Sequence, residues 1–313
     1  MRNIIFTFII PHYRIPELLQ RCLSTIPQRE DVQVIVVDDG SPDYDSYRAR
    51  FPDMFCHGVL WVHAPRHGGA GFARNLGLNR ARGKWVLFAD ADDFFSDSLP
   101  GFLDDNQDAH EDVIFYRNKC VMSNHPEEPS DRSGWTNHLF DRFAETGDIQ
   151  ELMFNHLSPW GKMINRKFLT DHQIKFDEIP YSNDVLFSTL IASKAKKVRV
   201  IDQCIYFLTE RKGSLTSDRM LKPGELSVRA DAATRAQVIA NKSGYRSLYF
   251  PLSHYLYKML YRDRKLFREF FKRIPDVYPS FWIPVKEMAR NESSRFRKAF
   301  VYTYSVYTFL TIR

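Results

Sequence analysis

The first half of the chain alternates between short apolar runs and segments with helical spacing. Nearly continuous apolar runs predict buried strands, and they lie at residues 3–10, 32–39, 59–63, 85–90 and 112–122. Apolar residues at helical spacing lie between them, at residues 16–26, 71–81 and 98–109. Strands that alternate with helices predict an α/β fold with a largely parallel sheet and covered faces.

The pattern changes after residue 122. Residues 123–137 are polar and rich in helix and strand breakers, which predicts a loop. Helical spacing returns and predicts helices at residues 138–155, 166–172 and 182–195, the last with Ser182 as its expected N-cap. A long strand is predicted at 197–210, followed by a polar loop at 211–218, and the pattern is helical from about residue 224 onward. We therefore expect a sheet domain over residues 1–220 and a helical region over residues 221–313.

Composition narrows the class of protein. With 44% hydrophobic residues the chain can bury a large core, so intrinsic disorder is excluded. No run approaches the roughly 20 apolar residues that span a bilayer. The four cysteines form no CxxC pair, which is typical of a reducing compartment, and we expect a cytoplasmic protein. Pro65 and two glycines prevent the helix that would align His63 and His67 on zinc.

The positive charge is concentrated in one part of the chain. Residues 253–313 hold 13 Lys/Arg, 5 Asp/Glu and 15 aromatic residues, whereas residues 1–252 carry a net charge of −2. No nucleic-acid motif accompanies the basic region, so no nucleic-acid partner is expected. Basic and aromatic residues together suit an anionic membrane surface. An ordinary helical subdomain or a dimer contact with solvated charges is an equally good interpretation.

Two predicted strands end in acidic residues. Asp38 and Asp39 follow one apolar run, and Asp90 and Asp92 follow another. The carboxyl ends of parallel strands are where such sheets place their sites. Asp90 and Asp92 lie two residues apart, which suits a hard divalent cation, or one metal ligand and one partner for a sugar hydroxyl. A solvated acidic loop and an Asp-Gly turn are the simpler alternatives.

A dinucleotide-binding domain is the main alternative from the strand and helix pattern, but its fingerprint is missing. It requires G-x-G-x-x-G in the first strand-to-helix turn, and that turn reads "PHYRIPE". The glycines occur later, in "HGGAGFARN", where Arg74 takes the place of the last glycine. Arg74 could orient a pyrophosphate or base, or pair with Asp38 or Asp39, and both interpretations stay open.

In order along the chain, six motifs resemble those of bacterial family 2 glycosyltransferases, which have the GT-A fold. They are "FIIPHYR", "VQVIVVDDGSPD", "GAGFARNLGLNRARGKWVLFADADD", "SPWGKMINRKFL", "YSNDVLF" and "YFLTERKGSLT". The resemblance covers roughly residues 3–220. It implies a nucleotide-binding half over about residues 1–122 and an acceptor half over about 123–220.

The resemblance also implies which residues bind the nucleotide. Pro11, Tyr13 and Asp39 match positions that line the base and ribose, with Asp38 beside them. Arg74 matches the arginine of the family's "ARN" block, also near the base. By analogy with the family, the nucleotide is expected to be UDP.

Metal and diphosphate contacts are implied in the same way. Asp90 and Asp92 match the family's DxD motif, which makes Asp92 the ligand of Mn²⁺ or Mg²⁺. Asp90 is then the contact to the ribose or donor sugar, and a second candidate ligand. Arg211 and Ser214 match a loop that closes over the diphosphate.

Asp184 matches the acidic residue that serves as general base, and Asn183 stands where many relatives have Glu. Without the resemblance, Asp184 is better explained as an acid in the first turn of a helix. For Trp160 and Lys162 we expect packing rather than chemistry.

The function that the resemblance implies is an inverting, metal-dependent transfer of a sugar from a nucleotide-sugar donor to a hydroxyl of a glycan or lipid-linked acceptor. By analogy with the family, the sugar is expected to be a hexose. Capsule, lipopolysaccharide and exopolysaccharide assembly are the expected settings, with a cytoplasmic location that could include peripheral contact with the membrane. A non-catalytic nucleotide-sugar or glycan-binding module on the same fold is the alternative, because a binder needs Asp39 and Asp92 but no base.

Overall fold

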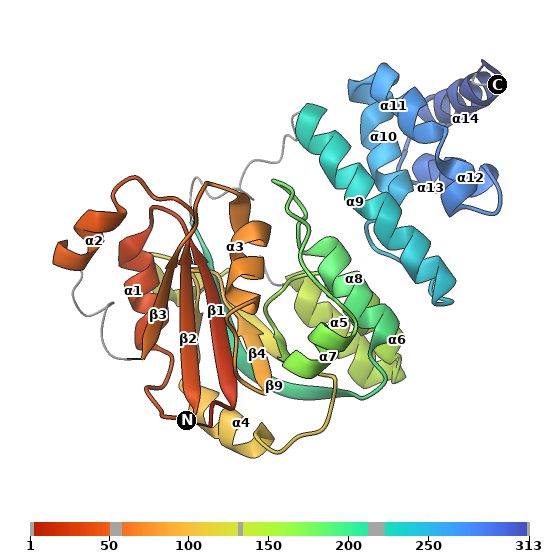
Figure 1. Ribbon diagram of the computed structural model, residues 1–313. Coiled ribbons are helices and arrows are strands. Elements are labelled where there is room, and N and C mark those ends of the chain that lie inside the picture. The colour runs from red at the N-terminus through yellow and green to blue at the C-terminus, as the bar shows by residue number, and fades with distance from the viewer. Residues whose placement is uncertain (1–2, 51–57, 131–133, 212–222, 312–313) are drawn as a thin grey trace. The chain divides into compact units, whose positions relative to one another are not determined.

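A computed structural model describes residues 3–50, 58–130, 134–211 and 223–311 of the 313-residue chain. The chain divides into two compact units, Met1–Asp218 and Arg219–Arg313, which we call unit 1 and unit 2. In the described residues, all strands lie in unit 1 and unit 2 contains only helices (Figure 1).

The strands of unit 1 form one sheet. In the described residues its order is β3-β2-β1-β4-β8-β6-β9-β5, with β7 paired to β6. The strands are β1 (Phe6–His12), β2 (Val32–Asp38), β3 (Val59–His63), β4 (Trp85–Phe88), β5 (Phe94–Phe95), β6 (Val113–Met122), β7 (His125–Pro129), β8 (Lys162–Asn165) and β9 (Val198–Glu210). Strands β1 to β4 run parallel, and so do β6 and β9, whereas β8 runs antiparallel between β4 and β6. The predicted α/β fold with a largely parallel sheet is confirmed.

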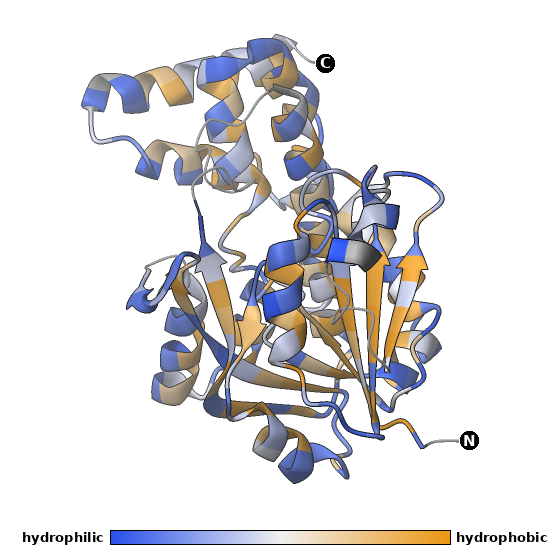
Figure 2. Cartoon of the chain, turned by 90° about the vertical axis from the view of Figure 1, so that its left-hand side faces the viewer, coloured by the Kyte–Doolittle hydropathy of each residue, from blue (hydrophilic) through white to orange (hydrophobic). Residues whose placement is uncertain are grey.

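The helices of unit 1 cover the sheet and connect its strands. They are α1 (Pro16–Ser24), α2 (Tyr44–Arg50), α3 (Gly69–Leu78), α4 (Leu99–Asn106), α5 (Gly134–Thr146), α6 (Ile149–Asn155), α7 (Arg166–Asp171) and α8 (Val185–Lys194). The central strands are apolar along most of their length and the helices mix apolar and polar residues (Figure 2). This contrast places the core between the sheet and its helical layers.

Strand β1 is buried on both faces because its side chains alternate between two helical layers. Phe8 and Ile10 belong to one buried cluster with Leu19 of α1. Ile9 points the other way, toward α3, where a Cβ on Gly77 would lie 2.4 Å from the Ile9 side chain. Because successive side chains of a strand point to opposite faces and both faces are covered, the sequence of β1 is apolar at most positions.

The first strand runs further than its sequence predicts. Pro11 and His12 were expected to end it, yet both pair in register with β2, Pro11 opposite Val37 and His12 opposite Asp38. On its other side, β1 pairs with β4 only as far as Ile9. Pro11 therefore lies where β1 has a partner on one side only, and its missing N–H leaves no gap in the β4 ladder.

Three further expectations were wrong in detail. The predicted loop at 123–137 contains β7 and the start of α5. The predicted helix at 138–155 is divided into α5 and α6 at Gly147, which has φ +69°. Asp184 rather than Ser182 occupies the N-cap position of α8, and Ser182, with a φ of 56°, lies in a tight turn before the helix.

Unit 2 is a helical unit with its own core. Its described helices are α9 (Pro223–Lys242), α10 (Leu252–Arg262), α11 (Arg264–Phe271), α12 (Ile274–Val277), α13 (Trp282–Arg290) and α14 (Arg295–Thr311). Leu256, Met259, Phe267, Met288 and Val301 are fully buried in it. Among the helices with described residues, none is both long enough and apolar enough to cross a membrane.

Candidate active site

The acidic strand ends predicted from the sequence lie at the same edge of the sheet. Strands β2 and β4 flank β1 in parallel, so their carboxyl ends come together. The Asp39 N–H donates to the His12 carbonyl at 2.8 Å, and the Ala89 N–H donates to the Ile9 carbonyl at 3.2 Å. The chain therefore leaves both strands on either side of the end of β1.

Asp38 is buried at the end of β2 and held by its neighbours. Its carboxylate accepts hydrogen bonds from His12 Nδ1 and from the Ser41 N–H, both at 2.8 Å. His12 Nε2 accepts the Ile15 N–H, which assigns the ring proton to Nδ1. Burial alone would raise the pKa of Asp38, but the bonds from His12 and Ser41 outweigh it and lower the pKa. The buried Asp38 side chain thus holds the loops after β1 and β2 in place. Its predicted role beside the nucleotide would be to support these loops.

Asp39 anchors the start of α3. Its Oδ1 accepts the Gly68 N–H and its Oδ2 accepts the Gly69 N–H, both at 2.8 Å. His67 Nδ1 lies 2.8 Å from the same Oδ2. A carboxylate at a helix N-terminus is favourable, and Gly69 has φ +83°, which glycine adopts without strain. Because a carboxylate offers about four lone-pair sites, Asp39 keeps capacity for one more donor, such as a base or ribose group.

Tyr13 presents an aromatic surface next to this carboxylate. Its side chain is 38% exposed, and its ring lies 4.5 Å from the His67 ring, centroid to centroid. The Arg14 guanidinium lies 5.3 Å from the centroid of the same Tyr13 ring. The family resemblance assigns Tyr13 and Asp39 to the base and ribose, and in the structure His67 contacts both of them. Pro11 lies near the end of β1, two residues before Tyr13.

Arg74 connects two parts of the predicted site. From α3 its Nη2 donates to Asp90 Oδ1 at 2.6 Å, and its Nη1 donates to Asn183 Oδ1 at 2.9 Å. The guanidinium also lies 5.3 Å from the centroid of the Phe176 ring. The alternative in which Arg74 pairs with Asp38 or Asp39 is wrong, because its carboxylate partner is Asp90.

The three aspartates after β4 have different environments. The Asp90 and Asp92 side chains are 32% and 23% exposed, whereas Asp93 is buried. Asp93 accepts hydrogen bonds from the Tyr206 hydroxyl at 2.8 Å and from the Thr209 N–H at 2.7 Å. Burial, together with the charges of Asp92 and Asp90, raises the pKa of Asp93 well above its usual value. The buried Asp93 carboxylate therefore connects the turn to β9. Of the three aspartates, only Asp90 and Asp92 can contact a ligand that enters from solvent.

The main chain of the turn is fixed as firmly as Asp93. The Asp92 carbonyl accepts from Arg21 Nη2 at 2.6 Å and from Thr209 Oγ1 at 2.7 Å, and the Asp90 N–H donates to the Tyr206 hydroxyl at 2.8 Å. Two partly exposed carboxylates on a rigid turn form a hard-oxygen donor set of the kind that Mg²⁺ and Mn²⁺ prefer. Asp90 and Asp92 therefore fit the predicted divalent cation.

A cation from the end of β9 lies beside this turn. Arg211 Nε is 3.5 Å from Asp92 Oδ2. Ser214, the other residue predicted to contact the diphosphate, lies outside the described residues.

Asp184 stands at the N-cap position of α8, but its carboxylate does not cap the helix. No side-chain hydrogen bond joins it to the first-turn N–H groups, so only the favourable interaction with the helix dipole remains of the simpler explanation. Burial raises the pKa of Asp184, the charge of Asp90 adds to this, and Arg74 and Lys162 oppose it. The carboxylate is thus available for chemistry, and its raised pKa suits a general base that must also release its proton.

The segment before Asp184 is fixed to α3. Asn75 donates from Nδ2 to the Phe176 carbonyl at 3.0 Å and accepts the Phe176 N–H at 2.9 Å. One turn earlier, a Cβ on Gly71 would lie 2.1 Å from the Asp177 carbonyl oxygen, so only glycine fits there. Helix α3 therefore sets the position of both Arg74 and the segment that leads to Asp184.

Several of these contacts could not be recognised in the sequence. The sequence pattern predicts no role for Arg21, Tyr206 or Thr209, and for His67 it raises only a zinc site that Pro65 and the glycines make unfavourable. The only signal for His67 was its position directly before the two glycines that open α3. Tyr206 is 113 residues away from Asp93, and no local pattern predicts that pair.

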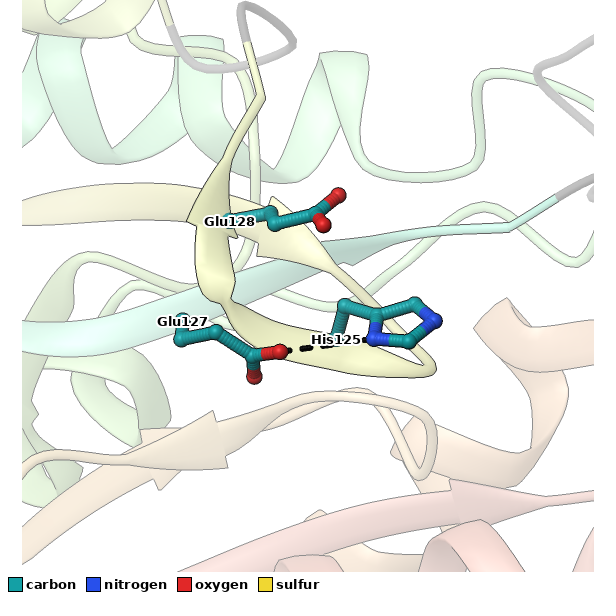
Figure 3. Close-up of side chains that lie close together, drawn as sticks. All are labelled: His125, Glu127 and Glu128. Atoms are coloured by element: carbon teal, nitrogen blue, oxygen red, sulfur yellow. Dashed lines mark hydrogen bonds and ion pairs between the residues drawn. The ribbon is translucent and has the colours of Figure 1, made fainter.

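The described residues contain a second group of possible metal ligands. In the described residues, His125, Glu127 and Glu128 of β7 have ligand atoms within 4.8 Å of one another (Figure 3). His125 Nδ1 lies 3.3 Å from Glu127 Oε1. All three side chains are exposed and no further feature of the described chain points to an ion there, so we assign this group no function.

Comparison with known proteins gives the family. The family model described as "Glycosyl transferase family 2" matches residues 7–172, slightly more than half of the chain. Glycosyltransferase GlyA of Streptococcus pneumoniae is 23% identical, over 67% of this chain and 31% of GlyA. Poly(ribitol-phosphate) beta-N-acetylglucosaminyltransferase TarS of Staphylococcus aureus is 26% identical, over 70% of this chain and 38% of TarS. The chain thus spans only about a third of the length of these two relatives.

Solved structures share the fold. The crystal structure of TarS residues 1–349 with UDP-GlcNAc matches 99% of this chain and 90% of that one, with a TM-score of 0.64 and 19% identity. The mannosyltransferase PcManGT of Pyrobaculum calidifontis, solved with GDP-Man and Mn²⁺, matches 96% of this chain and 79% of that one, with a TM-score of 0.54 and 18% identity.

Proposed function

This chain belongs to glycosyl transferase family 2 and has the GT-A fold, and on that basis we propose that it is an inverting glycosyltransferase. In this proposal the donor is a nucleoside diphosphate sugar, with UDP favoured because the TarS structure holds UDP-GlcNAc. The acceptor is a hydroxyl group of a glycan or of a lipid-linked glycan. One observation carries the proposal: Arg74 joins Asp90, at the donor end, to Asn183, the neighbour of Asp184.

The roles of the residues follow from their positions. Tyr13 and Asp39 would hold the base and ribose, with Pro11 and Asp38 behind them. Asp92 and Asp90 would hold a divalent cation, which when bound neutralises charge on a leaving diphosphate. Arg211, beside Asp92, would add a second positive charge there.

Asp184 would take the proton of the attacking hydroxyl. Its carboxylate is not used for helix capping, and Arg74 and Lys162 favour its charged form against the effect of burial. A hydroxyl activated by Asp184 attacks the sugar opposite the leaving diphosphate in a single displacement. The configuration at the anomeric carbon is therefore inverted, and no enzyme nucleophile is required.

The proposal predicts slow, metal-dependent hydrolysis of a nucleotide sugar. Incubating the protein with UDP- and GDP-sugars, each with Mn²⁺, Mg²⁺ or EDTA, should release nucleoside diphosphate from a UDP-sugar only when a metal is present. NMR of the first sugar formed should show the anomer opposite to that of the donor. Retained configuration would contradict inversion, and the absence of metal-dependent binding or hydrolysis for every donor would contradict the function itself.

We also propose that unit 2 contacts an anionic membrane surface, where a lipid-linked acceptor would lie on the cytoplasmic side. Trp282 of α13 and Tyr302 of α14 are 44% and 36% exposed, with ring centroids 6.5 Å apart. Lys286, Arg290 and Lys298 on the same two helices are exposed as well. Exposed aromatic rings next to basic side chains are typical of proteins that bind the interface of anionic bilayers.

Vesicle sedimentation tests this surface. The full chain should pellet with phosphatidylglycerol vesicles at low salt, and much less with phosphatidylcholine vesicles or at high salt, where surface charges are screened. Replacing Trp282 and Tyr302 together by Ser should reduce pelleting several-fold, whereas Tyr249→Ser, another exposed aromatic of unit 2, should not. Equal pelleting of all three proteins would rule out this surface as the membrane contact.

A further inference from the structure

Lys162, the first residue of β8, is a fully buried lysine whose charge favours the carboxylate form of Asp184 but whose hydrogen bonds the proposed mechanism does not use. It lies in the "WGK" stretch, where packing was expected. Its Nζ donates to the His156 carbonyl at 2.6 Å, to the Ser158 carbonyl at 2.5 Å and to Ser188 Oγ at 3.2 Å. A buried lysine is costly, so this arrangement needs an explanation beyond filling space.

The arrangement of acceptors specifies the charged form of Lys162. An ammonium group has three N–H donors and no acceptor, and three acceptors surround Nζ. Ser188 Oγ donates its own proton to the Leu157 carbonyl at 2.7 Å, so toward Lys162 it acts as an acceptor. Burial lowers the pKa of Lys162 to about 7, and Asp184 opposes that shift. The three bonds therefore hold a positive charge in the interior below about pH 7.

Lys162 is connected to the predicted base through one turn of helix. Ser188 lies in α8, and its N–H donates to the Asp184 carbonyl at 2.9 Å. Lys162 and Ser188 together fix the residues 156–158 against α8. Any shift of Ser188 is therefore passed on to Asp184 at the start of the same helix.

We propose that Lys162 is a positioning residue for the general base: it holds the first turn of α8 through Ser188 and supplies a positive charge that favours the carboxylate form of Asp184. This inference rests on the proposed role of Asp184. It assigns to the "WGK" segment a part in setting the working pH of the enzyme.

The direction of the pH effect follows from the groups that face Asp184. Arg74 from α3 and Lys162 from β8 favour its charged form, and Asp90 from the turn after β4 disfavours it. Removing the charge of Lys162 leaves Arg74 as the only one of these groups that favours the carboxylate. The pKa of Asp184 then rises, and because a base works only when deprotonated, the acid limb of the rate profile moves to higher pH.

Lys162→Met tests the charge. We expect kcat to fall roughly 10- to 100-fold, as a small misplacement of a catalytic group can cause. The acid limb of the profile of kcat against pH should move up by roughly half to one unit. The KM for the donor and the affinity for UDP with Mn²⁺ should stay within about twofold, since the described hydrogen bonds of Lys162 go to His156, Ser158 and Ser188 and not to donor residues.

Ser188→Ala separates the two parts of the proposal, because it removes the hydrogen-bonded link and keeps the lysine. We expect a lower kcat with a smaller movement of the acid limb than in Lys162→Met, because two of the three acceptors of the ammonium group remain. If Lys162→Met does not fold, Ser188→Ala decides alone: an unchanged kcat would overturn the positioning role. For a folded Lys162→Met protein, an unchanged kcat together with an unmoved acid limb would do the same.

NMR titration of the Asp184 carboxyl, using ¹³C-labelled aspartate, reads the charge effect without turnover. A higher pKa in Lys162→Met than in the unmodified protein is expected even if no donor is turned over. This separates the two hypotheses: absence of turnover in the unmodified protein refutes the proposed function, and an unmoved Asp184 titration refutes the role of the Lys162 charge.

Discussion

Asp184→Asn is expected to bind UDP and Mn²⁺ with normal affinity and to lose transfer activity by about 10²- to 10⁴-fold, the range that a general base contributes. The amide keeps the size and the N-cap position of the side chain but cannot accept the proton of the acceptor hydroxyl. Because the carboxylate makes no capping bond in α8, the fold should not depend on its charge. Isothermal titration with UDP and steady-state rates with a donor and acceptor measure the two effects separately.

Asp171→Asn provides the matched control. It removes a carboxylate at the end of α7 whose partner is Lys167, in an exposed pair that contributes little to stability. Its activity should equal that of the unmodified protein. If Asp184→Asn kept full turnover, the base would have to be another group. If it lost UDP binding, Asp184 would belong to the donor site, and the interpretation as a non-catalytic binding module would gain support.

Asp92→Asn is expected to abolish the metal-dependent part of UDP binding. A bound cation contributes several kcal/mol of transition-state stabilisation, so kcat/KM should fall by about 10²-fold or more. The Asp92 carbonyl is held by Arg21 and Thr209 independently of its side chain, so the turn should keep its shape. Mn²⁺ titration followed by electron paramagnetic resonance, with and without UDP, measures the loss directly.

Asp97→Asn is the control for this substitution, because Asp97 is an exposed carboxylate five residues further along the chain. It should bind Mn²⁺ and UDP normally. Equal Mn²⁺ affinity in Asp92→Asn and the unmodified protein would show that the cation is held elsewhere. A uniform loss of thermal stability with intact Mn²⁺ binding would instead assign Asp92 to the fold, in the manner of Asp93.

The fold was predictable where the sequence carries a local pattern. Continuous apolar runs predicted β2 and β4, because parallel strands covered on both faces need apolar side chains throughout. Strand β8 was missed, because its four residues begin with Lys162 and show no strand pattern. A lysine can occupy that position only because two carbonyls and a hydroxyl receive its protons, and these come from other parts of the chain.

The site was predictable as a set of residues but not as a set of contacts. The acidic ends of β2 and β4 could be located from the apolar runs before them. That Arg74 selects Asp90 and Asn183 depends on how α3 lies against the segment at 174–184, which no local pattern encodes. The different environments of Asp90 and Asp93 likewise come from Tyr206, which reaches the turn from a distant strand.

The close packing at Gly71 limits how this protein can be recombined with its relatives. A chimaera that exchanges the segment before α8 but keeps α3 would place one protein's backbone against another protein's helix. A Cβ at position 71 would lie 2.1 Å from the Asp177 carbonyl oxygen. A relative's α3 with Ala at this position could therefore not pack against the Asp177 backbone. Asn75 adds the same requirement through its paired bonds to Phe176. The transferable module is therefore α3 together with residues 174–184, and it combines parts of both halves that the family resemblance predicts, one on each side of about residue 122.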